Sequence, residues 1–205
     1  QTVAPGAAVT TLGNPDLKWE TTAQTDIGTD LFIFNHITFS ADYWIKNTTG
    51  VLLNLPISVA TGIGRNNGPY QNAAGIKNSG FEFALQYQGK IHDLNFTLSG
   101  NLSTVKNEVT SLGSVPYVLN LVNDAYNYGT FTYTAVGKPM SSFYGYVADG
   151  IFQNQADVDK HATQVGAAPG DVRFKDLNGD GQINADDRTV IGSPFPKFNY
   201  GFVIT

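Results

Sequence analysis

A strict two-residue alternation of side-chain character limits the fold of this chain more than any other feature. Over 19–33 the odd positions are apolar, Thr or Ala, whereas the even positions are mainly polar until Phe32. Because successive side chains of a β-strand point to opposite faces, this pattern predicts a long strand with one apolar and one polar face. After Asn35 and His36 the alternation restarts over 37–47, which predicts a tight hairpin.

The same alternation predicts a second hairpin and one further strand. The second hairpin pairs 80–88 with 94–103 through a five-residue turn that includes Gly89, and 198–205 repeats the pattern. Strands of about 9–11 residues have the length that a tilted membrane-spanning strand needs. The strand lengths alone are therefore compatible with a β-barrel that crosses a membrane.

The connections between these strands differ sharply in length. Segments 48–79 and 104–197 are long and rich in Asn, Gly, Pro and Tyr, so they are predicted to be loops. Short turns on one side and long loops on the other are typical of outer-membrane barrels. If the short turns face the periplasm, 104–197 is one extracellular excursion. Five strands cannot close a barrel, so the chain is expected to be a piece of a larger protein.

The predicted fold class is all-β: antiparallel strands of part of an outer-membrane β-barrel with long extracellular loops. One set of strand faces carries Phe, Leu and Tyr, and the other set carries polar residues suited to a wet lumen. A soluble β-sandwich is the alternative, since alternating strands with aromatic residues also form sandwiches. Such a sandwich would suit a carbohydrate-binding module with a calcium-stabilised loop.

Composition supports a β-protein and excludes several classes of function. Charged residues make up only 14% of the 205 residues, and Gly reaches 22 residues. The absence of Cys excludes disulfides, thiolate metal sites and cysteine nucleophiles. A net charge of −5 argues against nucleic acid as a partner. The first residues lack the features of an export signal, so any such signal is expected outside this sequence.

Four sequence segments, in this order along the chain, resemble those of one transporter family. They are NPDLKWETT at 14–22, NSGFE at 78–82, KPMSSFYGYVADGIFQ at 138–153, and PGDVRFKDLNGDG at 169–181, which continues to 194. In this order the segments are similar to those of SusC/RagA-type TonB-dependent outer-membrane transporters. Each motif is short, but together they extend over most of the chain.

The resemblance implies a transport protein of the outer membrane of a Gram-negative bacterium, and no enzyme. It implies that 1–205 is a partial C-terminal barrel domain, with two hairpins over 14–103, the excursion over 104–197 and the start of a further strand over 198–205. The implied function is import of nutrients such as oligosaccharides or peptides. The implied partners are outer-membrane lipid, a SusD-type surface lipoprotein, and TonB through an N-terminal part that these residues do not include.

The segment 176–187 has the spacing of a calcium-binding loop. Oxygen-bearing side chains stand at loop positions one, three and five, and Gly181 stands at position six. Position twelve is Asp rather than the usual Glu, which shortens its reach, and a tight turn that caps its own backbone is the alternative. The predicted ligands of a structural Ca²⁺ are Asp176, Asn178, Asp180, Gln182 through its carbonyl, and Asp187.

Aromatic residues of the long excursion are the second group of candidates. Aromatic faces stack on the C–H surfaces of sugars, although most aromatic side chains in proteins only pack against their neighbours. The predicted ligand contacts are Tyr117, Tyr126, Tyr128, Tyr133, Tyr144 and Tyr146. A glycoside hydrolase is disfavoured, because only three residues of the chain are Glu.

Overall fold

A computed structural model of the chain describes residues 12–54, 60, 68–121 and 130–205. The chain divides into two compact units, which we consider separately. Unit 1 comprises Gln1–Tyr117, Ala135–Pro139 and Phe195–Thr205, and unit 2 comprises Val118–Thr134 and Met140–Pro194. None of the helices in the described part is both long enough and apolar enough to cross a membrane.

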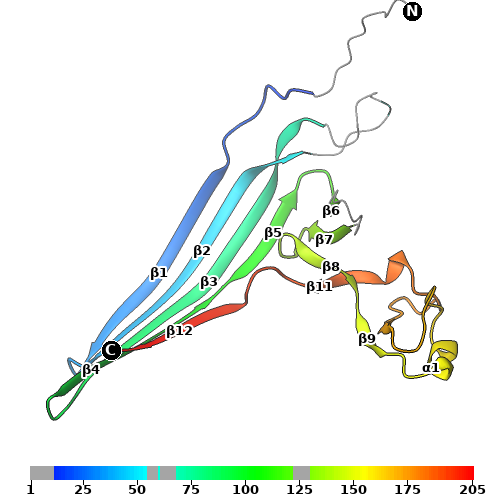
Figure 1. Cartoon of the computed structure of the whole chain (residues 1–205). Coiled ribbons are helices and arrows are strands. Elements are labelled where there is room, and N and C mark those ends of the chain that lie inside the picture. The colour runs from blue at the N-terminus through cyan, green and yellow to red at the C-terminus, as the bar shows by residue number, and fades with distance from the viewer. Residues whose placement is uncertain (1–11, 55–59, 61–67, 122–129) are drawn as a thin grey trace, which may run out of the picture. The chain divides into compact units, whose positions relative to one another are not determined.

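Unit 1 is built on a sheet of long antiparallel strands that lie side by side (Figure 1). Its order is β1, β2, β3, β4 and β12, and each neighbouring pair is antiparallel. The bounds are β1 (Thr21–Ile33), β2 (Ile37–Asn54), β3 (Tyr70–Ile91), β4 (Leu94–Thr104) and β12 (Phe198–Ile204). The two predicted hairpins are therefore confirmed, and the last strand pairs with the second hairpin.

The turns of the two hairpins use backbone conformations that few residues adopt. Phe34 and Asn35, between β1 and β2, have φ angles of 51° and 59°. Between β3 and β4, His92 has a φ of 56°. The predicted five-residue turn is wrong: β3 continues to Ile91, and Gly89 lies within it, opposite Phe96. The ring of Phe96 covers the space that a side chain at Gly89 would occupy, which explains a glycine inside the strand.

The prediction of a loop over 48–79 is also wrong at both ends. β2 runs to Asn54 and β3 begins at Tyr70, so these strands are longer than the alternation indicated. The cause is a bulge at Gly50, whose φ is 70° and where the pairing register shifts between Thr49 and Val51. A bulge inserts one residue and exchanges the two faces, which ends the simple period in the sequence.

β3 is long enough to pair with two successive strands. Residues 82–91, the lower part of β3, pair with β4. Residues 74–79, its upper part, pair with β5 (Lys106–Leu112), which follows β4 after Val105. The amide of Val105 donates to the carbonyl of Lys197 at 3.2 Å, at the point where β12 begins. A small core of Ala74, Val109, Leu112 and Ala135 is buried in this region.

The segment 135–139 completes the upper part of unit 1. The amide of Val109 donates to the carbonyl of Lys138 at 3.0 Å, and the amide of Gly137 donates to the carbonyl of Val109 at 2.8 Å. These bonds give β5 a partner on the edge away from β3. The core side chain of Val109 is only 1% exposed, so its backbone polar groups need such partners.

Most of the remaining elements belong to unit 2 and are short. One sheet has the order β11 (Arg188–Gly192), β8 (Ser142–Tyr146), β7 (Thr130–Ala135) and β6 (Tyr117–Leu121). A second sheet pairs β9 (Ala148–Ile151) with β10 (Val172–Phe174). The helix α1 (Gln155–Lys160) and the 3₁₀ turn η2 (Ala185–Asp187) complete the unit. Strands this short carry too few alternating positions to be predicted from sequence.

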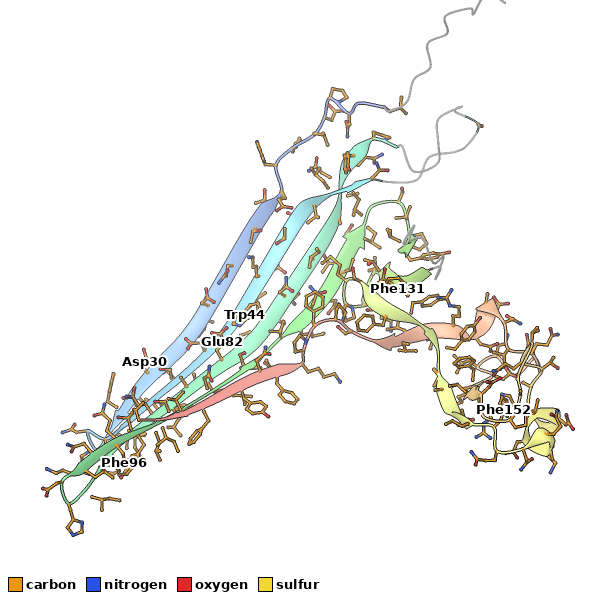
Figure 2. All side chains as sticks on the ribbon, viewed as in Figure 1. Asp30, Trp44, Glu82, Phe96, Phe131 and Phe152 are labelled. Atoms are coloured by element: carbon orange, nitrogen blue, oxygen red, sulfur yellow. The ribbon has the colours of Figure 1, made fainter. Side chains whose placement is uncertain are left out.

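The core of unit 2 forms around one aromatic side chain. Phe152, which Figure 2 labels, is 1% exposed. The ring of His161 lies edge-on to it with centroids 5.3 Å apart. His161 Nε2 lies 2.8 Å from the carbonyl of Phe174, which ties the end of α1 to β10. Asn154 caps α1 by accepting the amide of Asp157 at 3.0 Å.

Candidate functional site

One face of the sheet in unit 1 is apolar across all of its main strands. The pairing places Ile27, Tyr43 and Phe81 in one row, and Leu31, Phe39 and Leu85 in another. Ring contacts run along this face, for example between Tyr43 and Phe81 with centroids 4.8 Å apart. On β4 and β12 the face continues through Leu98, Leu102, Phe198, Tyr200, Phe202 and Ile204.

Most of these apolar side chains are exposed, and a few, such as Phe39 and Leu98, are half-buried. Leu85 is 51% exposed, Ile27 70% and Phe202 67%. In a two-layer sandwich the same side chains would be buried between sheets. The β-sandwich alternative therefore fails for the described part of this unit.

The apolar face forms a band of defined height. On β3 it begins at Phe81 and ends at Ile91, ten residue steps further on. At roughly 3.3 Å per residue this is about 33 Å along the strand. A tilt of about 40° reduces the height to about 25 Å, which equals the apolar band of outer-membrane barrels. The band therefore matches the thickness of a membrane's hydrocarbon layer.

The opposite face of the sheet is polar and acidic. Asp42 of β2 lies directly opposite Glu82 of β3, and Asp26 and Asp30 lie on the same face of β1. Figure 2 labels Asp30 and Glu82 on their strands. Among the described residues, no Lys, Arg or His side chain forms a salt bridge with these four carboxylates. A face of this kind suits a water-filled lumen and attracts cations.

Outer-membrane barrels carry a girdle of aromatic side chains on the lipid-facing side of both membrane interfaces, and one aromatic residue of this sheet does not fit such a girdle. Tyr43 and Tyr87 lie on the apolar face, as a girdle requires, but Trp44 lies opposite Asp26 on the polar face. Its indole N–H is buried and has no hydrogen-bond partner among the described residues. The physical reason is simple parity, since neighbouring residues on a strand cannot share a face.

The motif at 14–20 is attached to the sheet by one asparagine side chain. Asn72 Oδ1 accepts the amide of Lys18 at 2.8 Å, and its Nδ2 donates to the carbonyl of Lys18 at 2.7 Å. The same Nδ2 donates to the carbonyl of Gly50 at 2.7 Å. Asn14 adds a bond from its Nδ2 to the carbonyl of Tyr70 at 2.9 Å. The side chain of Asn72 thus holds the segment before β1 to the sheet, at a point where the backbone pairing of β1 with β2 has not yet begun.

The motif at 78–82 marks the point where β3 changes partner. Asn78 Oδ1 accepts from Nδ2 of the buried Asn107 at 2.7 Å. The amide of Phe81 donates to Oγ1 of Thr104 at 2.9 Å. A side chain at Gly80 would collide with the carbonyl of Thr104, so the close approach of the two strands requires glycine here.

The structure brings three of the six tyrosine candidates together. Tyr133 and Tyr144 stack with centroids 5.1 Å apart, and the Arg188 guanidinium lies 4.7 Å from the Tyr144 centroid and 5.9 Å from that of Tyr146. Tyr146 also contacts Phe174, with centroids 5.1 Å apart. These five residues form a continuous ladder in unit 2.

The aromatic rings of the ladder pack against one another and against the guanidinium of Arg188, as structural aromatic residues do. All three tyrosines are half-buried. Tyr117 is 47% exposed, whereas Tyr126 and Tyr128 lie outside the described residues. Ligand contact by any of these six side chains stays a prediction.

The loop 176–187 is held by hydrogen bonds of its own. Asp176 accepts the amides of Gly179 at 2.6 Å and Gly181 at 2.9 Å. Asp180 accepts the amide of Gln182 at 2.8 Å, and the side-chain amide of Asn178 at 3.1 Å. Among the residues the structure describes, no three or more Asp, Glu, His or Cys side chains are grouped to hold a metal. Any cation here would depend on amide and backbone oxygens as well.

Asp187 is the anchor of this loop. It is fully buried, and its carboxylate accepts the amides of Leu177 at 2.8 Å and Asn184 at 2.9 Å. The latter bond is half of a capping box at the start of η2. These backbone donors, Asn184 first and Leu177 second, hold the pKa of Asp187 below its usual value.

The lowered pKa predicts how the loop responds to acid. A carboxyl group with a depressed pKa stabilises the folded loop at neutral pH, and this stabilisation is lost as the pH falls from about the ordinary value of 3.8 through the lowered one. The protection of the Leu177 and Asn184 amides from hydrogen exchange, relative to the intrinsic rate at each pH, should therefore fall only in this acidic range. Asp187→Asn should accelerate the same amides already at neutral pH, whereas the exposed Asp186→Asn should not. Equal effects of the two substitutions would contradict the role of Asp187.

The two-faced sheet and its band height define the wall of a membrane-type β-barrel. The model of the family described as "TonB dependent receptor-like, beta-barrel" matches residues 1–194. The chain belongs to this family. The family match confirms the coarser part of what the motifs indicated, a TonB-dependent receptor barrel.

Individual relatives agree with the family. TonB-dependent receptor P26 of Formosa agariphila is 33% identical over 92% of this chain and 19% of the relative. TonB-dependent receptor P3 of the same organism is 31% identical over 96% of the chain and 20% of the relative. The chain thus spans about a fifth of the length of these relatives.

Solved structures show the same fold. A structure described as the RagAB peptide transporter matches 96% of this chain and 20% of that chain, with a TM-score of 0.69 and 27% identity. The RagAB peptide importer in an "open-open" state matches with a TM-score of 0.69 and 26% identity, over 97% of this chain and 20% of that chain.

Sequence reasoning missed three residues that organise the structure. Asn72, Asn107 and Arg188 stand in segments that were predicted to be loops, so no period marked them. Each acts through one side chain that contacts a residue far away in the sequence: Asn72 contacts Lys18, Asn107 contacts Asn78, and Arg188 contacts Tyr144. Such contacts depend on register, which a single sequence does not reveal.

Proposed function

We propose that this chain is part of the wall of a SusC/RagA-type TonB-dependent transporter that imports nutrients across the outer membrane of a Gram-negative bacterium. The observation that carries the proposal is the exposed apolar band of about 25 Å on one face of the sheet and the acidic face behind it. Family membership and the four ordered motifs support it. The chain's own part is structural, and it performs no chemistry.

Peptides are the first cargo to test. The similar solved structures are described as a peptide transporter and a peptide importer, and oligosaccharides are the second cargo that the motifs imply. TonB, acting on a part outside this chain, is the proposed energy source, and a SusD-type lipoprotein is the proposed partner at the outer surface. The long segments of unit 2, with the tyrosine ladder, are proposed to contribute to the outer cavity.

Uptake by living cells tests this proposal. A strain that lacks the intact transporter should lose accumulation of labelled oligopeptides, and restoring the gene should recover it only when TonB is present. Loss of oligosaccharide uptake instead would change the cargo but keep the function. Uptake that continues without TonB would contradict the proposal.

We also propose a structural calcium ion in the loop 176–187. The loop is already ordered by Gly179 and Gly181 at φ angles of 74° and 81°, so binding would cost little further ordering. An affinity of about 10⁻⁴–10⁻³ M is expected for an extracellular site of this kind. Calorimetry on the intact transporter should give heat of calcium binding that Asp180→Ala removes. No heat with either protein would leave the self-capped turn as the full explanation.

A further inference from the structure

The outward face of unit 1 changes character directly above the apolar band. The next row of paired residues on this face is Ile45, Ser79 and Lys106. The row after that contains Asn47, Lys77 and Glu108. Paired residues share a face, and these rows continue the parity of Tyr43 and Phe81. Two lysines therefore stand on the face of the band, within two rows of its upper edge.

Lys106 is exposed, Lys77 is half-buried, and both lie beside a single acid. The Lys106 Nζ lies 3.0 Å from Glu108 Oε2, and the two side chains are 75% and 35% exposed. Lys77 is paired directly with Glu108 across the ladder. Two positive charges and one negative charge thus occupy neighbouring strands, which leaves a net positive patch.

The other end of the band has no such patch on this face. The band ends there with Ile91 opposite Leu94, and the turn carries His92 and Asp93. Lys90 is near this end, but it pairs with Asn95 on the polar face of the sheet. In the described part of unit 1, lysine adjoins the band on the outward face only at the end away from the short turns.

We propose that Lys77 and Lys106 bind phosphate groups of lipid headgroups in the outer leaflet of the membrane. The inference rests on the proposed function, because it needs the apolar band to lie in lipid. An apolar band fixes the height of the headgroups, and the two lysines stand at that height on the same continuous surface. A phosphate placed there gains two ammonium partners, and it competes with Glu108 for Lys106.

Lipid retention by the intact transporter tests this proposal. The protein is placed in nanodiscs of phosphatidylcholine that contain either phosphorylated lipid A or the same lipid after removal of its phosphates. Native mass spectrometry then counts the lipid A molecules that each protein retains after washing. Wild type should prefer the phosphorylated form, and K77Q/K106Q should lose roughly fivefold of this preference per lysine.

Matched variants separate headgroup binding from a loss of structure. Lys90→Gln removes a charge from the polar face and should leave the preference unchanged. K77R/K106R should keep it, and Glu108→Gln should increase it, because that change frees Lys106. An unchanged preference in K77Q/K106Q, or an equal loss in Lys90→Gln, would overturn the inference. If wild type retains neither form of lipid A, the inference fails. A transporter that does not insert into the nanodiscs at all would count against the proposed function instead.

Discussion

Replacing Leu85 with Arg is expected to destabilise the intact transporter by about 2–4 kcal/mol, because it places a charge near the middle of the bilayer. Leu85 lies on β3 at the centre of the apolar band, between Phe81 and Ile91, and is 51% exposed. The free energy of unfolding is to be measured by urea titration of the protein folded into lipid vesicles.

The neighbouring position supplies the control for this prediction. Gln86 pairs with Thr38 and Ser99 on the polar face, so Gln86→Arg should alter the free energy of unfolding by much less than Leu85→Arg. Similar losses of unfolding free energy at the two positions would mean that both faces of the sheet lie in the same environment. A larger cost for Gln86→Arg would mean that the assignment of lipid and lumen is reversed.

Replacing Gly80 with Ala is expected to cost about 1–3 kcal/mol, the usual range when an extra methyl group is forced into a tight site. The added methyl would meet the carbonyl of Thr104, which belongs to the backbone and has little freedom to move. The same carbonyl lies where β3 leaves β5 and begins to pair with β4. The urea titration described above would measure the loss.

Gly100→Ala is the matched control in the same sheet. A Cβ at Gly100 would lie 3.8 Å from the carbonyl of Gly201, which is an ordinary contact. Alanine also loses less conformational freedom on folding than glycine, so this variant should be neutral or slightly stabilised. Equal losses for the two variants would contradict the proposed role of Gly80.

The sequence predicted the parts of the fold that depend on strand period. It located both hairpins, the last strand and the polar or apolar character of each face, because alternation at Phe81–Gln88 or Phe198–Ile204 is a direct consequence of strand geometry. It failed where the period is broken, at the bulge of Gly50 and in the short strands of unit 2. It also placed Gly89 in a turn, because the covering ring of Phe96 lies on another strand.

The sequence likewise predicted only those parts of the candidate sites that depend on local spacing. The spacing of the loop 176–187 predicted a calcium-binding loop, with a tight Asp/Asn/Gly turn as the alternative, and spacing does not show whether its carboxylates bind a cation or their own backbone amides. The grouping of Tyr133, Tyr144 and Tyr146 follows from the pairing of β7, β8 and β11, which depends on contacts between separate segments. Arg188, which joins the ladder, lies within the fourth motif, but nothing in the sequence indicated its contact with Tyr144.

Spin-label accessibility along β3 tests the two-faced wall most directly. These 205 residues contain no Cys. Once any cysteines elsewhere in the transporter are replaced, single cysteines at 82–87 can be labelled one at a time in lipid vesicles. Labels at Phe83, Leu85 and Tyr87 should collide mainly with oxygen, which concentrates in lipid. Labels at Glu82, Ala84 and Gln86 should collide mainly with a water-soluble nickel complex. Collision rates without this two-residue period, or with the opposite phase, would contradict the account.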